Sequence, residues 1–413
     1  MEGIGLLVVL AAIFTFAMFG RRLERTIITA PMVFLAVGYA LSSTDWLPED
    51  AARESLEILA EVTLVILLFL DASQIDLGHL KKQHVWPQRM LIRGMPLAIV
   101  FGTLAAWLFF PSWPLVALAL VAALLTPTDA ALGQSILMNK QIPVRVRRSL
   151  TVESGLNDGL ALPAVLLFAS LTAQAMDLGT RDWLLFAILQ LTLGPLVGVV
   201  IGYAAGKAHL AADERMLSSR TLEGIAALTL AMATYLIADL VGGNGFMAAF
   251  VGGLCFGNIV KGKCDFVFEF SEGEGQLLMW GTFLLVGLTL LPDALAMLDW
   301  RVAGLILVSL FIVRPLAIWL SLAGSDASPT TRLFFGWFGP RGLATAIFAL
   351  LIIEKLDGWL AAPIMAVAIN AVWISALLHG VTAAPLGNAY ARKAEATDEC
   401  PEKMAIIEPF GRV

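Results

Sequence analysis

Apolar runs of membrane-spanning length occupy most of the chain, and they limit its fold more than any other feature. About 20 apolar residues cross the hydrocarbon core of a bilayer, where every backbone polar group needs a partner within the protein. Hydrophobic residues make up 59% of the chain and charged residues only 15%, whereas soluble proteins carry about 25% charge. We therefore expect an all-α polytopic membrane protein with about 13 transmembrane helices. They lie near residues 4–19, 26–42, 55–71, 91–110, 115–137, 149–173, 183–206, 221–241, 245–259, 275–291, 301–322, 332–354 and 361–385.

The charge of the connecting loops predicts the orientation of these spans. Cytoplasmic loops of membrane proteins are enriched in Lys and Arg. In this chain 21 of the 27 Lys and Arg residues fall in one set of alternate loops, and 4 fall in the other set. This asymmetry favours an odd number of spans, with the N-terminus outside and the C-terminus in the cytoplasm. We expect the protein in the plasma membrane, which would be the inner membrane of a Gram-negative bacterium.

Net charge and composition argue against several other classes of protein. A net charge of −6 without a long basic block argues against a nucleic-acid partner. The 3 cysteines include no CxxC pair, so a disulfide framework or zinc site is not expected. The sequence shows no metal-ligand cluster, nucleophile–base pair or phosphate loop of an enzyme. The predicted partner is the lipid bilayer, and no resident cofactor is expected.

Acidic and polar residues interrupt two of the apolar runs. Asp129 lies within LLTPTDAALG, and Ser154 and Asp158 lie within VESGLNDGLALP. An ionised side chain at the bilayer centre costs roughly 2.5–3.5 kcal/mol even on lenient insertion scales, so it is retained for a reason. Ser154 and Asp158 are four residues apart and share a helix face, and Glu153 and Asn157 form a second such pair. Carboxylates grouped with a hydroxyl indicate a cation site.

Each of these residues also has a structural interpretation. Asp158 could be a permanently protonated or paired acid, and Asp129 could serve a helix break. Ser154 could bond its own backbone four residues earlier. These alternatives stay open at the level of the sequence.

Two spans carry residues that break a helix. Pro127 removes a backbone donor and disfavours helix at the residue before it, which predicts an unwound stretch whose carbonyls, such as that of Thr128, become oxygen ligands. FGPRGLATA, around Pro340 and Arg341, repeats this pattern seven spans later. Because seven is odd, the two breaks would occupy matched places in two inverted six-helix repeats with broken, crossing helices.

Four charged residues share one expected depth in the membrane. At about 1.5 Å per helical residue, Asp129, Asp158, Arg314 and Arg341 each lie roughly 12–14 Å from the cytoplasmic boundary. We therefore expect them to form one buried cluster.

ALLTPTDAALG, VESGLNDGLALP, FIVRPLAIWL and FFGWFGPRGLATAIFAL closely resemble the sodium/proton exchanger branch of the monovalent cation/proton antiporters, which is NhaP-like in type. The resemblance extends to about residue 386. It implies a homodimer whose protomers have a dimerisation domain and a core domain that moves like an elevator. The domain boundaries implied are 1–90, 207–293 (dimerisation), 91–180, 294–386 (core), 181–206 (linker span) and 387–413 (short cytoplasmic tail).

The resemblance also assigns roles to individual residues. It implies a cation and proton site made by Asp129, Asp158, Ser154 and the Thr128 carbonyl. It implies a bracing network in which Glu153 and Asn157 turn toward Arg341, with Arg314 neutralising the ends of broken helices. Asp71, at the end of the third span, resembles a residue on the ion's approach, at a position where Glu is common in the family.

The predicted function is secondary-active antiport of a monovalent cation, Na+ first and Li+ next, for H+. The residue before Asp158 is Asn157 and not a second Asp. This resembles the electroneutral branch of the family, which implies one proton exchanged for each cation. pH homeostasis is the expected physiological role. An ion channel or transport-inactive sensor on the same fold, and a membrane enzyme, are the competing classes; pore-lining rings and an added cytoplasmic domain are not seen in the sequence.

Overall fold

The computed structural model describes residues 2–23, 27–44, 46–75, 77–78, 85–129, 132, 134–137, 139, 141–175, 183–217, 219–260, 271–353, 356 and 358–395. All regular secondary structure within these residues is helical. The first half contains α1 (Glu2–Leu23), α2 (Ala30–Ser42), α3 (Glu49–Ser73), α5 (Val85–Arg89), η1 (Met90–Gly94), α6 (Met95–Phe109), α7 (Leu115–Leu124), α8 (Gln134–Leu137), α9 (Val144–Ala175) and α10 (Trp183–Glu214). The second contains α11 (Arg220–Leu240), α12 (Gly245–Val260), η3 (Ser271–Gly275), α14 (Gln276–Thr289), α15 (Leu291–Ala296), α16 (Trp300–Val308), η4 (Ser309–Val313), α17 (Arg314–Ser321), α18 (Pro329–Trp337), α19 (Leu343–Ile353) and α20 (Ala361–Glu395).

Each predicted apolar segment coincides with one helix or with helices that follow one another directly or across a short break. Among the described residues, 7 helices are long and apolar enough to cross a membrane. Four apolar helices are shorter. α7 and α19 each adjoin a break in their span, and the other two belong to short spans. The all-helical class is therefore confirmed, while the number of 13 crossings and their orientation stay predictions.

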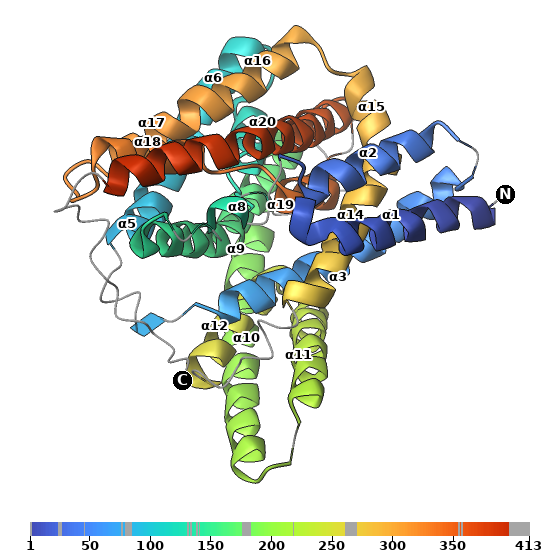
Figure 1. Ribbon diagram of the computed structural model, residues 1–413, viewed down its shortest axis with the longest axis vertical. Coiled ribbons are helices and arrows are strands. Elements are labelled where there is room, and N and C mark those ends of the chain that lie inside the picture. The colour runs from blue at the N-terminus through green and yellow to red at the C-terminus, as the bar shows by residue number, and fades with distance from the viewer. Residues whose placement is uncertain are drawn as a thin grey trace.

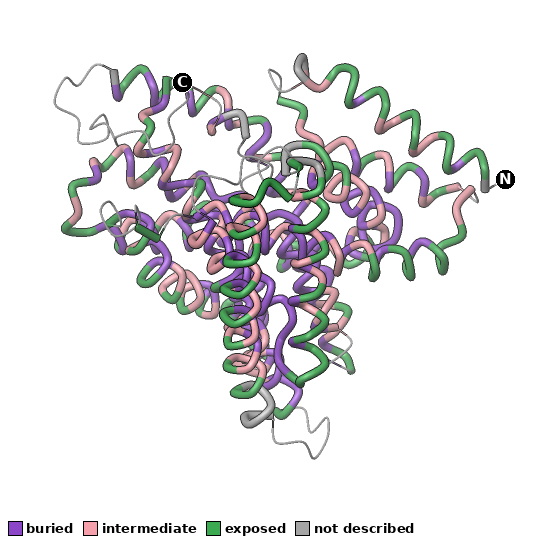
Figure 2. Tube along the Cα trace, turned by 90° about the horizontal axis from the view of Figure 1, so that it is seen from below, coloured by how far each residue is buried: buried purple, intermediate pink, exposed green. Residues whose placement is uncertain are grey.

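The helices surround α9, which runs through the middle of the molecule, with α10 and α11 projecting side by side below it (Figure 1). Buried residues concentrate on the inner helices, whereas the tube of α1, from the N-terminus, is exposed along much of its length (Figure 2). The exposed side chains of α1 include Leu6, Leu7, Leu10 and Phe14. An apolar exposed face of this kind fits a lipid or protein neighbour.

Small residues bring α10 and α12 into close contact. Gly194, Gly198, Gly202 and Gly206 recur at every fourth position of α10 and face α12 or the residue before it. A Cβ atom added at Gly198 would lie 2.5 Å from the carbonyl oxygen of Ala248. Packing of backbones over small residues is a main source of helix association in membranes. α10, the expected linker span, therefore packs directly on α12, which also contacts α3.

A π-helical turn precedes a proline in two spans that pack against each other. η1 comes just before Met95–Pro96, and η4 comes just before Arg314–Pro315. A proline lacks the N–H that would continue the α-helical bonding, so a wider turn accommodates the preceding residues. These spans are the fourth and eleventh of the predicted order. The two π turns are therefore a second matched feature of the expected inverted repeats, in addition to the two breaks.

The connection between α17 and α18 is held by arginines from other helices. Arg145, at the start of α9, binds both carboxylate oxygens of Asp326, at 2.5 and 3.1 Å. The indole of Trp86 donates to the same carboxylate at 2.7 Å, and the Arg145 guanidinium lies 3.7 Å from the centre of the Trp86 ring. Arg89 donates to the Ala323 carbonyl at 2.7 Å. These contacts join α5, α9 and residues 323–328 into one unit.

The expected tail from residue 387 begins as helix. α20 continues through Pro385 to Glu395, because its last turns pack on α18: the Tyr390 ring stacks on Phe334 with centroids 4.2 Å apart. The Tyr390 hydroxyl also bonds that of Thr331 at 2.8 Å. Residues 396–413 of the predicted tail lie outside the described residues.

We predict that Gly198→Leu destabilises the protein by about 1–3 kcal/mol, because the larger side chain must push α12 away from α10. Thermal unfolding in detergent, followed by tryptophan fluorescence, measures the loss. Gly224→Leu on α11 is the matched control, since a Cβ there meets nothing within 4 Å. Equal melting temperatures for the two variants would contradict the packing role of Gly198.

We predict that Asp326→Asn lowers stability at neutral pH but not in acid. Partial burial raises the pKa of Asp326, but hydrogen bonds from Arg145 and Trp86 and the Arg145 charge outweigh this effect, so the pKa lies below its ordinary value. A lowered folded-state pKa stabilises the protein above the unfolded value, about 4, and this stabilisation disappears as the pH falls through the folded value. Unfolding temperatures of the two proteins should therefore differ at pH 7 and converge below about pH 4. Glu54→Gln, at an exposed position, should show no such pattern.

Candidate functional site

The span of α7 and α8 is unwound at the predicted position. α7 ends at Leu124, and residues 125–129 are not helical. Thr126 bonds back into α7, its hydroxyl donating to the Ala122 carbonyl at 2.8 Å. Pro127 has no N–H with which to continue the helix. Thr126 and Thr128 are nevertheless buried, at 4% and 3% exposure, so their carbonyls need partners inside the protein.

The two breaks cross and bond each other. The N–H of Asp129 donates to the Pro340 carbonyl at 2.9 Å. In return, the Asp129 carboxylate accepts the N–H of Leu343, the first residue of α19, at 3.2 Å. Any side chain at Gly342 would collide with this carboxylate. Asp129 therefore sits at the positive end of a half-helix, where a carboxylate is stabilised.

α9 brings the predicted serine and acid to the first break. The Ser154 hydroxyl donates to the Thr128 carbonyl at 2.7 Å. Asp158, one turn further along α9, has a buried oxygen, Oδ1, that meets no hydrogen-bond donor among the described residues. Asp158 is close enough to Asp129 and Asp71 for their charges to interact. The Ser154 hydroxyl, the Thr128 carbonyl and the Asp158 carboxylate, all expected from the sequence, thus lie close together.

Asp71 lies beside α9 rather than in a solvated loop. It is near the end of α3, and its Cβ is 3.9 Å from the position a side chain would take at Gly155. It is partly exposed, as are Asp129 and Asp158. The three acids are therefore more accessible than the residues that brace them.

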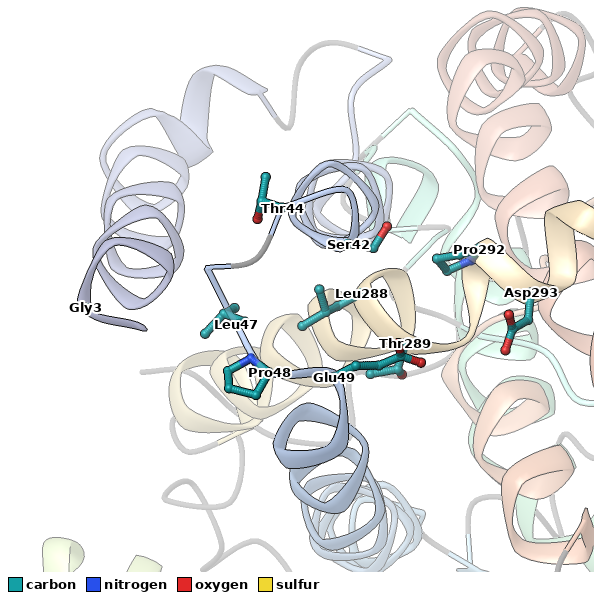
Figure 3. Close-up of a pocket in the computed structure, with 10 residues that line it drawn as sticks. All are labelled: Gly3, Ser42, Thr44, Leu47, Pro48, Glu49, Leu288, Thr289, Pro292 and Asp293. Atoms are coloured by element: carbon teal, nitrogen blue, oxygen red, sulfur yellow. The ribbon is translucent and has the colours of Figure 1, made fainter. Parts of the chain in front are cut away.

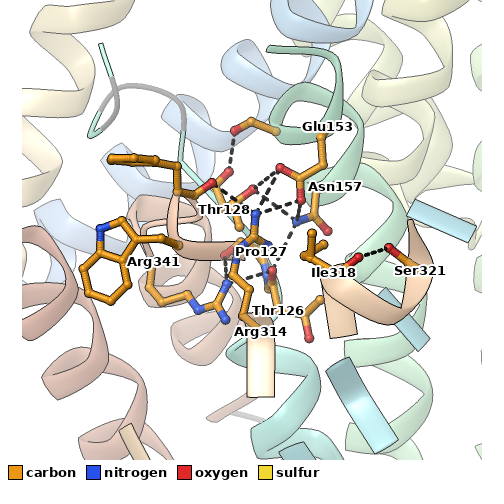
Figure 4. Close-up of polar contacts among 12 residues, drawn as sticks. Thr126, Pro127, Thr128, Glu153, Asn157, Arg314, Ile318, Ser321 and Arg341 are labelled. Carbon is orange, nitrogen blue, oxygen red and sulfur yellow. Dashed lines mark hydrogen bonds and ion pairs between the residues drawn. The ribbon is translucent and has the colours of Figure 1, made fainter. Parts of the chain in front are cut away.

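Glu153 forms the buried ion pair of the site, and its partner corrects one expectation. Arg314, not Arg341, donates to the two oxygens of Glu153, at 3.2 and 3.3 Å, and also to the Phe338 carbonyl at 3.3 Å. Asn157 donates to the Thr126 carbonyl and the Thr128 hydroxyl, both at 3.2 Å. The π turn before Arg314 places it between α9 and the second break. Glu153, Asn157 and Arg314 form a network behind the break (Figure 4).

Arg341 shares the role expected of Arg314, which itself donates to the Phe338 carbonyl at the end of α18. The Arg341 guanidinium donates to the Thr126 and Pro127 carbonyls, at 3.2 and 3.4 Å, so it neutralises the negative end of the broken span (Figure 4). It is 2% exposed. Which arginine pairs with Glu153 could not be read from the sequence, since both arginines share one expected depth.

All nine predicted residues of the site and its approach lie around the two breaks. Two further residues, Ser375 and His379, are buried at 0% and 1% exposure on α20 and bond the segment around the second break. A histidine inside the apolar run 361–385 was the signal available in the sequence.

A separate cavity of about 830 Å³ lies among α1, α14, α15 and the segment that joins α2 to α3 (Figure 3). Its wall includes Glu49 and Asp293, both of which pair with Arg53, at 3.6 and 3.7 Å. None of the predicted site residues lines it. These ion pairs are well exposed and contribute little to stability.

Comparison with known proteins gives a family match over most of the chain. The family described as "Sodium/hydrogen exchanger, transmembrane" matches residues 7–389. The K(+)/H(+) antiporter NhaP of Alkalimonas amylolytica is 28% identical over 319 residues, which are 74% of this chain and 51% of that protein. The K(+)/H(+) antiporter NhaP2 of Shewanella oneidensis is 32% identical over 258 residues, 61% of this chain and 43% of that protein.

A more distant relative is the Na(+)/H(+) antiporter 2 of Zygosaccharomyces rouxii, 26% identical over 327 residues, 74% of this chain and 40% of that protein. The chain spans about half the length of these curated relatives, or less. Among solved structures, the sodium proton antiporter MjNhaP1 from Methanocaldococcus jannaschii at pH 8 shares the fold, with a TM-score of 0.76 and 20% identity. That similarity covers 95% of this chain and 100% of the other.

We predict that Arg314→Gln destabilises the protein by about 3–5 kcal/mol, because it leaves the buried Glu153 carboxylate without its ion partner. The double variant Glu153→Gln, Arg314→Gln should recover part of this loss, since it leaves no unpaired charge. Thermal unfolding of the three proteins in detergent measures the difference. A double variant less stable than Arg314→Gln would contradict the pairing.

Proposed function

Because the chain belongs to the sodium/hydrogen exchanger family, we propose that it is a secondary-active antiporter that exchanges a monovalent cation for H+ across the membrane. The observation that carries this proposal is the bond between Ser154 and the Thr128 carbonyl beside Asp158. The Ser154 hydroxyl and the Thr128 carbonyl offer two oxygens suited to an alkali cation. Oδ1 of Asp158, one turn away, accepts no described hydrogen bond.

The proposed exchange follows from competition at Asp158. When the carboxyl carries a proton, Ser154 donates its own hydrogen to the Thr128 carbonyl, as in this structure. When the proton leaves, the carboxylate attracts a cation, and the Ser154 hydroxyl rotates so that its oxygen faces the ion. The Thr128 carbonyl is then free to bind the ion as well. Proton and cation therefore exclude each other, which couples their fluxes.

Asp129 and Asp71 have supporting roles in this proposal. Asp129 contributes negative charge to the site while its carboxylate is held at the start of α19. Asp71, on α3, lies on the ion's approach. Glu153, Asn157, Arg314 and Arg341 hold the two breaks and do not bind the ion.

Electroneutral exchange, with one proton for each cation, is the stoichiometry we propose. Asn157 cannot titrate, and its amide nitrogen donates to Thr126 and Thr128. On α9, Asp158 is then the acid that alternates between proton and cation. Transport into proteoliposomes driven by a membrane voltage alone would overturn this stoichiometry.

Na+ is our first candidate for the cation, and Li+ and K+ are the alternatives. K+ is named for the relatives from Alkalimonas and Shewanella, and Na+ for the relative from Zygosaccharomyces. We further propose a homodimer in the plasma membrane with an elevator-type movement of the core, serving pH homeostasis.

We predict that Asp158→Asn and Asp129→Asn abolish exchange while the protein still inserts and folds. Asn keeps the size of each side chain but cannot exchange a proton or neutralise a cation. The measurement is dequenching of a pH-sensitive dye in everted vesicles after addition of Na+, Li+ or K+. Asp293→Asn, at the wall of the separate cavity, is the matched control and should exchange as the wild type does.

Two outcomes would contradict this prediction. A wild-type protein that responds to none of the three cations would remove the antiporter function. Exchange at the wild-type rate by Asp158→Asn would mean that the site lies elsewhere.

A further inference from the structure

α20 holds both sides of the break between α18 and α19. On one side, Nε2 of His379 lies 2.9 Å from the carbonyl oxygen of Trp337, the last residue of α18. On the other side, the Ser375 hydroxyl accepts the backbone N–H of Arg341 at 2.7 Å. Ser375 and His379 are one helical turn apart, with Oγ and Nδ1 separated by 3.1 Å. Two joined side chains therefore fix the ends of the non-helical segment 338–342.

Both ring nitrogens of His379 lie near carbonyl oxygens: Nε2 is 2.9 Å from that of Trp337, and Nδ1 is 2.9 Å from that of Ser375. A carbonyl oxygen can only accept, so His379 donates to Trp337 in the tautomer that carries its hydrogen on Nε2. In that neutral ring Nδ1 accepts from the Ser375 hydroxyl, 3.1 Å away. The oxygen of Ser375 still has a lone pair for the Arg341 N–H. The Trp337 ring stacks on the imidazole, with centroids 5.0 Å apart and planes inclined by 22°, so the pair has little freedom to move.

The pair holds the backbone of Arg341 in place, and Arg341 in turn binds the first break, at residues 125–129. The Arg341 guanidinium binds the carbonyls of Thr126 and Pro127, the two residues directly before Thr128. A displacement of the Arg341 backbone would therefore move the segment that carries the Thr128 carbonyl. Among the described hydrogen bonds from α20 side chains, the one from Arg341 to Ser375 is the bond to the backbone of residues 338–342.

We propose that Ser375 and His379 are positioning residues for the cation site. They fix the backbone of Arg341 so that its guanidinium holds residues 126–127, which sets the position of the Thr128 carbonyl for a monovalent cation. Neither residue touches the ion. The inference rests on the antiport function proposed above and adds to it a part of α20 that lies behind the site.

The test compares four variants by their exchange kinetics for the best cation of wild type. Ser375→Ala removes the acceptor for Arg341, and His379→Leu removes the donor to Trp337. His379→Gln keeps an amide N–H that can donate to the same carbonyl. Thr382→Val is the matched control, because Thr382 lies one turn further along α20 and bonds only the Trp337 indole N–H, at 3.0 Å, and its own helix.

The positioning role predicts a change in affinity. Loss of one such hydrogen bond should raise the apparent KM for the cation about 3- to 10-fold in Ser375→Ala and His379→Leu, with a smaller change in maximal rate. His379→Gln should recover most of the wild-type KM, and Thr382→Val should keep it. If His379→Leu does not fold, Ser375→Ala and His379→Gln still carry the comparison.

Three results would overturn the inference. With an active wild type, unchanged KM values in Ser375→Ala and His379→Leu would show that the Arg341 backbone needs no such support. An equal rise in Thr382→Val would show that α20 only packs. A wild type that exchanges no cation would remove the proposed function itself, and this inference with it.

Discussion

The ends of the interrupted helices lie inside the protein, and the rest of the site depends on how these ends are satisfied. A helix end leaves its last carbonyls and first N–H groups without intrahelical partners, and water cannot serve them in a membrane interior. At the first break, Arg341 and Asn157 bind the carbonyls of residues 126–127. At the second, Arg314 and His379 reach the carbonyls of Phe338 and Trp337. Asp129 accepts the first N–H of α19. Each partner is a charged or strongly polar group, which explains why so many gather around the two breaks.

The same arrangement leaves Asp158 without an arginine or a helix end as its partner among the described residues. Glu153 is paired with Arg314, and Asp129 is held at a helix N-terminus. Arg341 is committed to backbone carbonyls. Asp158 accepts a backbone hydrogen bond from Thr128 but lies near no cationic side chain among its named neighbours, and its acidic neighbours repel its charge. This is the physical reason to propose that a proton or a monovalent cation completes the site, because either adds one positive charge where the protein supplies none.

The sequence predicted the two breaks and the residues around them, because proline and glycine limit backbone geometry locally. Pro127 and Pro340 each fall within the segment that is not helical. It did not predict which arginine meets Glu153. That choice depends on a π turn before Arg314 and on the crossing of two breaks more than 200 residues apart in sequence, as in the bond from Asp129 to Pro340. It also gave no sign that the glycines of α10 pack on α12, since their four-residue spacing names no partner.

The origin of the site residues also bears on how the site could move. Ser154, Asp158, Asp129 and the Thr128 carbonyl come from α9 and the first break, which the second break and α20 support. Contacts through Arg145 and Asp326 join α9 to α5 and residues 323–328, so these elements resist separation. Asp71 is the one acid of the group on α3, a helix that packs closely on α12 through Gly253 and Gly257. A movement that kept each of these two units intact would carry the whole proposed site past Asp71 without breaking the bonds that form it. That division favours an elevator-type movement over a rearrangement within the site.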